Sequence, residues 1–275
     1  MTSPSDPHPI GVFDSGVGGL SVLRAIRAEL PAEDLLYAGD SGFAPYGDKS
    51  HEFVQQRARA LTRFLLTHRA KAIVVACNTA TGVAVETLRA EFAVHIIAIE
   101  PAIKPAVVRT KTGVVGVLAT SGTLSSSNVT RLVSKYGGDV RVLVQACPGL
   151  ADQVEKGDLG SAVTRSLVEQ FVRPLIQQRA DVLALGCTHY PFLSGVIQQA
   201  AGADVELIDP ATAVAREVRR RLETAGLLRS VESVGREQFW TTGHVGAVAR
   251  VMSDLWGSAV DVQPVEAGAR SASEV

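Results

Sequence analysis

Short runs of apolar residues alternate with longer stretches of helical periodicity along most of the chain. Eight such runs predict β-strands, at residues 10–14, 34–39, 72–77, 95–99, 113–119, 140–146, 181–186 and 204–208. The clearest helical pattern covers residues 51–69, where Phe53, Ala58 and Leu61 keep a 3.6-residue period. Strands that are apolar throughout and alternate with helices predict an α/β fold with mostly parallel sheets flanked by helices.

A weak internal repeat indicates two pseudo-symmetric open lobes. The segment IGVFDSGVGGL (10–20) resembles VGVLATSGTL (115–124), and a cysteine motif follows each of them. The steps Glu100-Pro101 and Asp209-Pro210 each follow an apolar strand and open a helical pattern, so we expect the chain to cross between lobes there. The predicted boundaries place lobe one at residues 1–99 and 210–275 and lobe two at residues 100–209, with the active site between them.

The two cysteine motifs occupy matching positions in these lobes. Each is a run of apolar and small residues that ends in a cysteine, AIVVACNTATG around Cys77 and VLALGCTHYPF around Cys187. Ligands bind at the carboxyl ends of strands in open α/β sheets, so both thiols are expected to point into a site. The thiolate is the reactive form of cysteine. Two such thiols in matching lobes suggest one base and one acid on opposite sides of a substrate.

Polar residues also follow both cysteines. Asn78 and Thr79 come directly after Cys77, where side-chain and backbone donors could hold a carboxylate. His189 lies two residues after Cys187 and supplies a titratable partner for its thiol. These neighbours argue against the alternative that the cysteines are inert, buried hydrophobic residues.

Two further polar segments follow the first two predicted strands. Asp14 and Ser15 end the first strand, and the GVGG that follows leads into a helix whose N–H groups and dipole favour an anion. A tight turn capped by Asp14 explains the same residues, and the spacing matches neither a dinucleotide nor a phosphate-loop motif. Asp40 and the PYG sequence at 45–47 form a polar loop that is expected to project from the same sheet edge.

Composition limits the classes of function that the chain is expected to have. The chain of 275 residues has 27 basic and 28 acidic residues, and a formal net charge of −1 gives no field that recruits nucleic acid or a membrane surface. No apolar run approaches the ~18 residues of a membrane span, and the first residues show no signal-peptide pattern. We therefore expect a soluble, cytoplasmic enzyme with a disordered tail at EAGARSASEV (266–275).

The sequence gives little sign of a metal or an organic cofactor. The six histidines are scattered and no Cys-x-x-Cys pair exists, so metal binding is not expected. No lysine ends a strand in a setting suited to a pyridoxal Schiff base. By pattern alone, Cys147 is interpreted as a structural cysteine and Glu155 as part of a solvated helix face.

Five segments together resemble the glutamate racemases of the cofactor-independent aspartate/glutamate racemase superfamily. The resemblance covers about residues 10–265 in order and spacing. The segments that carry it are GVFDSGVGGLSVL (11–23), GDSGFAPYGDKS (39–50), VACNTAT (75–81), the CP…E segment (147–155) and GCTHYPFL (186–193).

The resemblance implies that L-glutamate and D-glutamate are interconverted at the α-carbon without a cofactor, with Cys77 and Cys187 as the two acid/base residues. Asp14 would support Cys77 and His189 would support Cys187, while Asp40 and Glu155 match family acidic residues at the site edge. Substrate-binding residues implied in this way are Asp14, Ser15, Asp40, Tyr46, Gly47, Asn78, Thr79, Thr188 and His189. The chain departs from the family pattern at Gly149 and Asp152, which leaves the role of Glu155 open.

The resemblance also implies a homodimer in a bacterial cytoplasm that supplies D-glutamate for peptidoglycan synthesis. An aspartate racemase of the same superfamily is the nearest alternative, but Asp14-Ser15 and His189 favour glutamate. Some family members are linked to inhibition of DNA gyrase, which the near-zero net charge does not support. A two-lobed amino-acid binder and a thiol oxidoreductase are the remaining alternatives from other classes.

Overall fold

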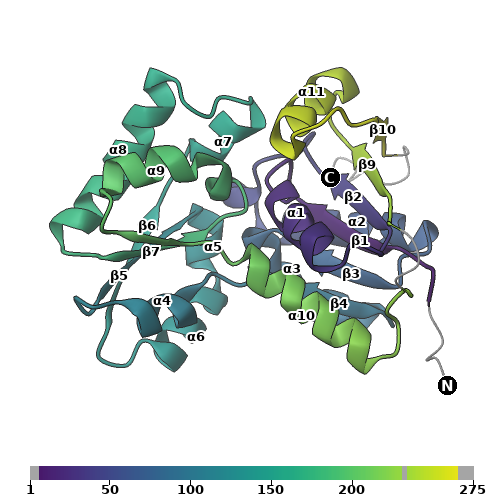
Figure 1. The fold of residues 1–275 in the computed structure, drawn as a ribbon, viewed down its shortest axis with the longest axis horizontal. Helices are drawn as coiled ribbons and strands as arrows, with labels where there is room; N and C mark the ends of the chain where they lie inside the picture. Colours follow the sequence, from purple (N-terminus) through teal and green to yellow (C-terminus); the bar gives the residue numbers. More distant parts are fainter. Residues whose placement is uncertain (1–5, 231–233, 266–275) are drawn as a thin grey trace.

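Two parallel β-sheets form the framework of the protein (Figure 1). The structure is a computed structural model, and it describes residues 6–230 and 234–265. The six-stranded sheet has the order β10-β9-β2-β1-β3-β4 and the four-stranded sheet the order β6-β5-β7-β8. We call each sheet with its covering helices the first and the second lobe. The strands of the first are β1 (Ile10–Asp14), β2 (Leu35–Gly39), β3 (Ala72–Val75), β4 (His95–Ala98), β9 (Glu237–Thr241) and β10 (Val262–Pro264). Those of the second are β5 (Val114–Ala119), β6 (Arg141–Ala146), β7 (Val182–Gly186) and β8 (Glu206–Ile208).

Helices cover both faces of each sheet, which is why the strands are apolar on both sides (Figure 1). In the first lobe α1, α10 and α11 pack on one face and α2 and α3 on the other. In the second lobe α4 and α6 pack on one face and α7, α8 and α9 on the other. The helices of the first lobe are α1 (Leu20–Glu29), α2 (His51–Thr67), α3 (Asn78–Glu91), α10 (Ala211–Thr224) and α11 (Val245–Trp256), with the 3₁₀ turn η1 (Tyr46–Asp48). Those of the second are α4 (Ile103–Arg109), α5 (Ser121–Ser125), α6 (Ser127–Tyr136), α7 (Leu150–Glu155), α8 (Ala162–Gln177) and α9 (Ser194–Ala201), with η2 (Tyr190–Leu193).

One hydrophobic core runs through both lobes. It joins the α1 face of the first sheet, including Val12 and Leu23, to the α8 face of the second, including Val172 and Leu185. The lobes therefore share buried apolar surface and do not merely touch at polar edges.

The α/β class and the eight expected strands are confirmed, and all strand pairs in the described residues are parallel. The strand expected at residues 72–77 ends at Val75, because Cys77 already caps α3. Strands β9 and β10 were not expected. Two polar residues open the first of them, and the second is a three-residue edge strand ending in proline, so neither carries a strong apolar pattern. The expected lobe boundaries stay a prediction, and the tail at residues 266–275 lies outside the described residues.

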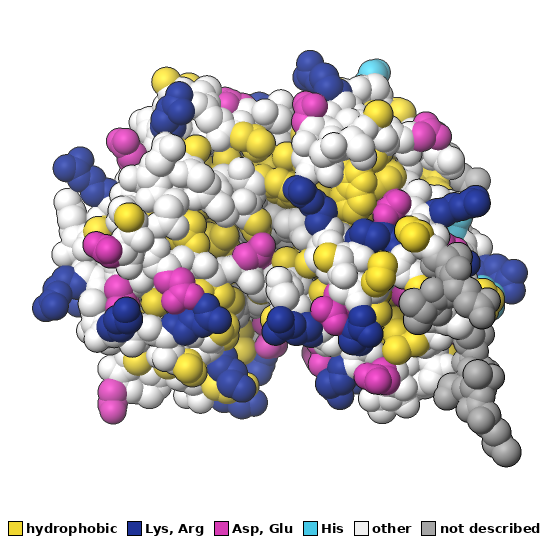
Figure 2. Space-filling model, in the orientation of Figure 1, with side chains coloured by type: hydrophobic (Ala, Val, Ile, Leu, Met, Phe, Trp, Pro, Cys, Tyr) yellow, Lys and Arg dark blue, Asp and Glu magenta, His cyan; other side chains and the backbone are white. Residues whose placement is uncertain are grey.

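The surface in the view of Figure 2 mixes the two signs of charge. Lys and Arg side chains alternate with Asp and Glu over both lobes, so this face has no large patch of one sign. Within residues 6–230 and 234–265, no helix combines the length and apolar character that crossing a membrane requires.

Candidate active site between the two sheets

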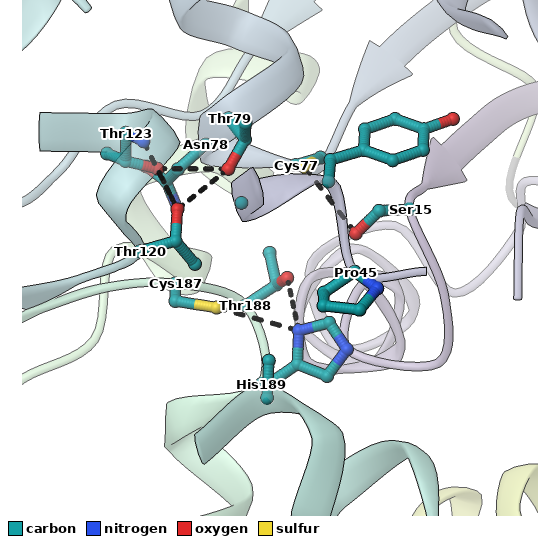
Figure 3. Close-up of a pocket in the computed structure, with 13 residues that line it drawn as sticks. Ser15, Pro45, Cys77, Asn78, Thr79, Thr120, Thr123, Cys187, Thr188 and His189 are labelled. Carbon is teal, nitrogen blue, oxygen red and sulfur yellow. Dashed lines mark hydrogen bonds between the residues drawn. The ribbon is translucent and has the colours of Figure 1, made fainter. Parts of the chain in front are cut away.

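Residues at the carboxyl ends of strands from both sheets line one small cavity, and Figure 3 shows their side chains. Its volume is about 10 Å³, the room for about one water molecule. Residues following β1, β3, β5 and β7 contribute to its wall, so the two halves of the sequence repeat meet here. The lining consists of Ser15, Pro45, Tyr46, Gly47, Cys77, Asn78, Thr79, Thr120, Thr123, Ala151, Cys187, Thr188 and His189.

Cys77 lies on the first-lobe side of the cavity, at the N-cap of α3. Its Sγ accepts a hydrogen bond from the N–H of Ala80 at 3.4 Å and lies 3.7 Å from Ser15 Oγ. Burial raises the pKa of this thiol far above its usual range, and the nearby charge of Asp14 raises it further. The thiol is therefore the resting form, while the helix N-terminus is placed to stabilise a thiolate when one forms.

Cys187 lies on the second-lobe side, beside an imidazole. Its Sγ is 3.5 Å from His189 Nδ1, and His189 Nε2 is 2.6 Å from Glu155 Oε1. Burial acts to lower the pKa of His189, but the charges and hydrogen bonds of Cys187 and Glu155 outweigh it and raise that pKa well above its ordinary value. A cation is thus held 3.5 Å from the sulfur of Cys187.

Glu155 also joins the lobes. The carboxylate that pairs with His189 accepts the backbone N–H of Val17, from the first lobe, at 2.7 Å. A Cβ added to Gly16 would lie 1.8 Å from Glu155 Oε1, so the carboxylate occupies space that only glycine leaves free. The residue does not line the cavity itself; it acts on the site through His189.

Asp14 is fully buried and sits where the lobes meet. Its carboxylate accepts the N–H of Gly19 at 2.7 Å and the hydroxyl of Thr188, from the opposite lobe, at 3.3 Å. Burial raises the pKa of Asp14. No hydrogen bond between Asp14 and Cys77 occurs in the part of the chain described, so any support for Cys77 acts through charge.

Asn78 brings an unsatisfied amide to the cavity. Its side chain is 3% exposed, yet neither Oδ1 nor Nδ2 has a hydrogen-bond partner within the described residues. Leaving such buried groups unpaired costs about 1–3 kcal/mol each. The amide is therefore prepared to donate to a carboxylate and accept from an ammonium group.

Asp40 and Tyr46 are placed differently from simple substrate contacts. Asp40 is buried behind the cavity wall, where it forms a two-bond ion pair with Arg57 at 2.7 and 2.8 Å. The Tyr46 hydroxyl donates to the same carboxylate, and so does Thr242. Tyr46 and Gly47 line the cavity while Asp40 anchors their loop from behind.

Four lining residues were missed from the sequence: Pro45, Thr120, Thr123 and Ala151. The internal repeat could have found Thr120, because it aligns with Ser15 when 10–20 is placed on 115–124. Nothing comparable marks Ala151. Cys147, expected to be structural, is 2% exposed and lies outside the lining. Among the described residues, no group of three or more His, Cys, Asp or Glu side chains is arranged to hold a metal ion.

Comparison with known proteins gives a consistent picture. Residues 10–218 match the family model described as Asp/Glu/Hydantoin racemase. A glutamate racemase of Methylococcus capsulatus is 54% identical over 261 residues, which cover 95% of this chain and 96% of that protein.

Solved structures agree. A glutamate racemase isoform from Bacillus anthracis superposes with a TM-score of 0.87 at 35% identity, covering 95% of this chain and 99% of that one. The Escherichia coli glutamate racemase, solved in complex with L-glutamate and the activator UDP-MurNAc-ala, gives 0.82 at 30% identity, with 94% and 98% covered.

Proposed function

The chain belongs to the Asp/Glu/hydantoin racemase family, and we propose that it interconverts L-glutamate and D-glutamate by moving the α-proton between Cys77 and Cys187. One observation carries the assignment of the two residues. Cysteines from opposite lobes line a single small cavity, and each is held by a different set of polar partners.

In racemisation one thiol acts as the base and the other as the acid. One removes the α-proton from one face, and the planar carbanion then takes a proton from the thiol on the other face. Cys77 is assigned as the initial acid because burial raises its pKa and keeps it protonated, and Cys187, whose sulfur lies 3.5 Å from His189 Nδ1, is assigned as the initial base. After turnover the protonation states are reversed, and the opposite enantiomer becomes the substrate.

The groups that hold the substrate must supply the rest of the stabilisation that the transition state needs. If the α-carbon lies on the order of ten pKa units above a thiol, proton transfer is uphill by about 14 kcal/mol. A positioned base contributes only about 10²–10⁴-fold. The amide of Asn78 and the hydroxyl of Ser15 supply donors for the carboxylate as it gains enolate character. The small volume of the cavity keeps bulk water away from the reacting groups and strengthens these contacts.

The direct test is a circular-dichroism or polarimetric record of the purified, metal-chelated protein with L-glutamate, D-glutamate and L-aspartate, with no cofactor added. Both glutamate signals are expected to decay to zero while the aspartate signal stays constant. Loss of the aspartate signal alone would replace glutamate by aspartate as the substrate. No change in any sample would contradict racemisation and favour an amino-acid binder.

Glu155 provides a test of the Cys187–His189 pair. The charge of Glu155 helps to raise the pKa of His189, so Glu155→Gln is expected to lower that pKa. The cation is lost as pH rises through the pKa of His189, and the alkaline limb of the kcat/KM profile should therefore move to lower pH. Asp152→Asn, on the same helix and without a side-chain contact to the site, is the matched control. An unmoved alkaline limb in Glu155→Gln would contradict this role.

The physiological setting follows from the product. D-glutamate made in this way would supply peptidoglycan synthesis in a bacterial cytoplasm. The homodimer implied by the family resemblance stays a prediction.

A further inference from the structure

A second cavity lies outside the one that Cys77 and Cys187 line, which we call the chamber. It has a volume of about 350 Å³ and lies between η1 and α2 of the first lobe and α5 of the second. Gly47 and Thr79 line both cavities, so one wall separates them. We call this outer cavity the groove. Its lining consists of Gly47, Asp48, Lys49, His51, Val54, Thr79, Val83, Ser121, Gly122 and Ser125.

The wall between the groove and the chamber is a contact between lobes that leaves no spare room. A Cβ added to Gly122 would lie 2.8 Å from the carbonyl oxygen of Gly47, and one added to Gly47 would lie 3.0 Å from Thr120 Cβ. Beside this contact the hydroxyls of Thr79, Thr120 and Thr123 bond to one another at 2.9–3.1 Å (Figure 3). The wall is thus made of backbone and of threonine hydroxyls, and the hydrogen bonds of Thr79 cross from one lobe to the other.

The chamber cannot admit an amino acid as it stands. A volume of about 10 Å³ holds about one water molecule, which has a single non-hydrogen atom. Glutamate has roughly ten non-hydrogen atoms and therefore does not fit. The wall must therefore open at some point of its surface. The Gly47–Gly122 contact is a point where a small separation of the lobes connects the chamber with a ready-made space.

We infer that the groove is the antechamber through which a small anionic amino acid reaches the catalytic chamber, and that the Gly47–Gly122 contact is its gate. The identity of the amino acid rests on the proposed function; the route does not. Lys49 and Asp48 give the groove one cation and one anion, which match the carboxylate and ammonium groups of such a ligand. The hydroxyls of Ser121 and Ser125 add hydrogen-bonding groups at the second-lobe side.

Alkylation of the cysteines tests the route without requiring catalysis. The wild-type protein and its variants are treated with iodoacetamide, and modification of each cysteine is followed by peptide mass spectrometry. Cys147 is buried outside the chamber and serves as the internal control for unfolding. Because the readout is access to a thiol, it stays informative even if the protein does not racemise glutamate.

Two substitutions should act in opposite directions. Gly122→Val places a side chain in the gate and holds the lobes apart, so alkylation of Cys77 and Cys187 should become about tenfold faster although racemisation falls. Ser125→Trp fills the groove from its exposed side and should slow both cysteines and lower kcat/KM. Ser127→Trp, at an exposed position of the next helix outside the groove, is the matched control.

The outcomes separate cleanly. Faster modification of the chamber cysteines in Gly122→Val with Cys147 unreactive supports the gate, and slower modification in Ser125→Trp alone supports the groove. The proposal would be overturned if Cys77 and Cys187 were alkylated at the wild-type rate in Gly122→Val. It would also be overturned if their alkylation rates were equal in Ser125→Trp and Ser127→Trp. If Gly122→Val exposes Cys147, the smaller Gly122→Ala is measured in its place under the same criteria.

The charge of the groove is tested with an anionic reagent. Iodoacetate carries a carboxylate and iodoacetamide does not, so the ratio of their rates at Cys77 isolates the effect of charge. Lys49→Gln should lower this ratio, whereas Lys135→Gln, outside the groove, should leave it unchanged. An equal ratio in wild type and Lys49→Gln would remove Lys49 from the proposal.

Discussion

Cys77→Ala and Cys187→Ala are each expected to lower racemisation by about 10⁴-fold, because each removes the thiol that gives or takes the proton on one face of the carbanion. The remaining thiol can still remove an α-proton and return one to the same face. Each variant should therefore exchange the α-proton of one enantiomer with solvent deuterium while its configuration is retained. The two variants should act on opposite enantiomers.

The measurement combines chiral chromatography with mass spectrometry of glutamate incubated in deuterium oxide. Cys147→Ala is the control, because this cysteine is buried outside the chamber lining and should leave racemisation near the wild-type rate. Racemisation at the wild-type rate by either chamber variant would remove that cysteine from catalysis. Exchange of the same enantiomer by both variants would contradict their placement on opposite faces.

The sequence predicted the parts of the site that depend on strand ends. Parallel strands that are apolar throughout must present their carboxyl ends at one edge, and this placed Asp14, Asp40 and Cys77 after three neighbouring strands. The repeat related Cys77 to Cys187 by the same reasoning. Local pattern is sufficient here because each residue is fixed by the strand immediately before it.

Contacts between distant segments could not be predicted in this way. Glu155 meets Val17 across 138 positions of the chain, and its helix has a pattern that also suits a solvated face. Closure of the chamber depends on the angle between two sheets, which no local period encodes. Arg57 is the clearest case, because a charged residue on the apolar stripe of α2 gives no sign of what it pairs with.

Arg57 is 1% exposed, the largest fully buried side chain of the described residues, and its guanidinium lies over the Phe43 ring at 4.0 Å. It forms the two-bond ion pair with Asp40, which in turn holds the hydroxyl of Tyr46. Removal of one member of a buried pair leaves the other charge without compensation. The free energy of unfolding and the position of the Tyr46 loop thus depend on the same contact.

Arg57→Met is therefore expected to lower the free energy of unfolding by about 3–5 kcal/mol, measured by urea denaturation. Arg59→Met is the matched control on the same helix. Arg59 pairs with Glu91 in a partly exposed ion pair, whose loss should cost about 1 kcal/mol or less. Equal losses in the two variants would show that the buried pair has no special weight.

The double variant Arg57→Met/Asp40→Asn separates stability from positioning. It removes the uncompensated carboxylate and should recover much of the stability lost in Arg57→Met, since a buried pair replaced on both sides is far less costly than one broken on one side. The Tyr46 hydroxyl loses its charged acceptor in the double variant, so the chamber wall is held less firmly and KM is expected to be higher than in the wild type. Recovery of stability together with a wild-type KM would mean that the ion pair stabilises the fold without positioning the site.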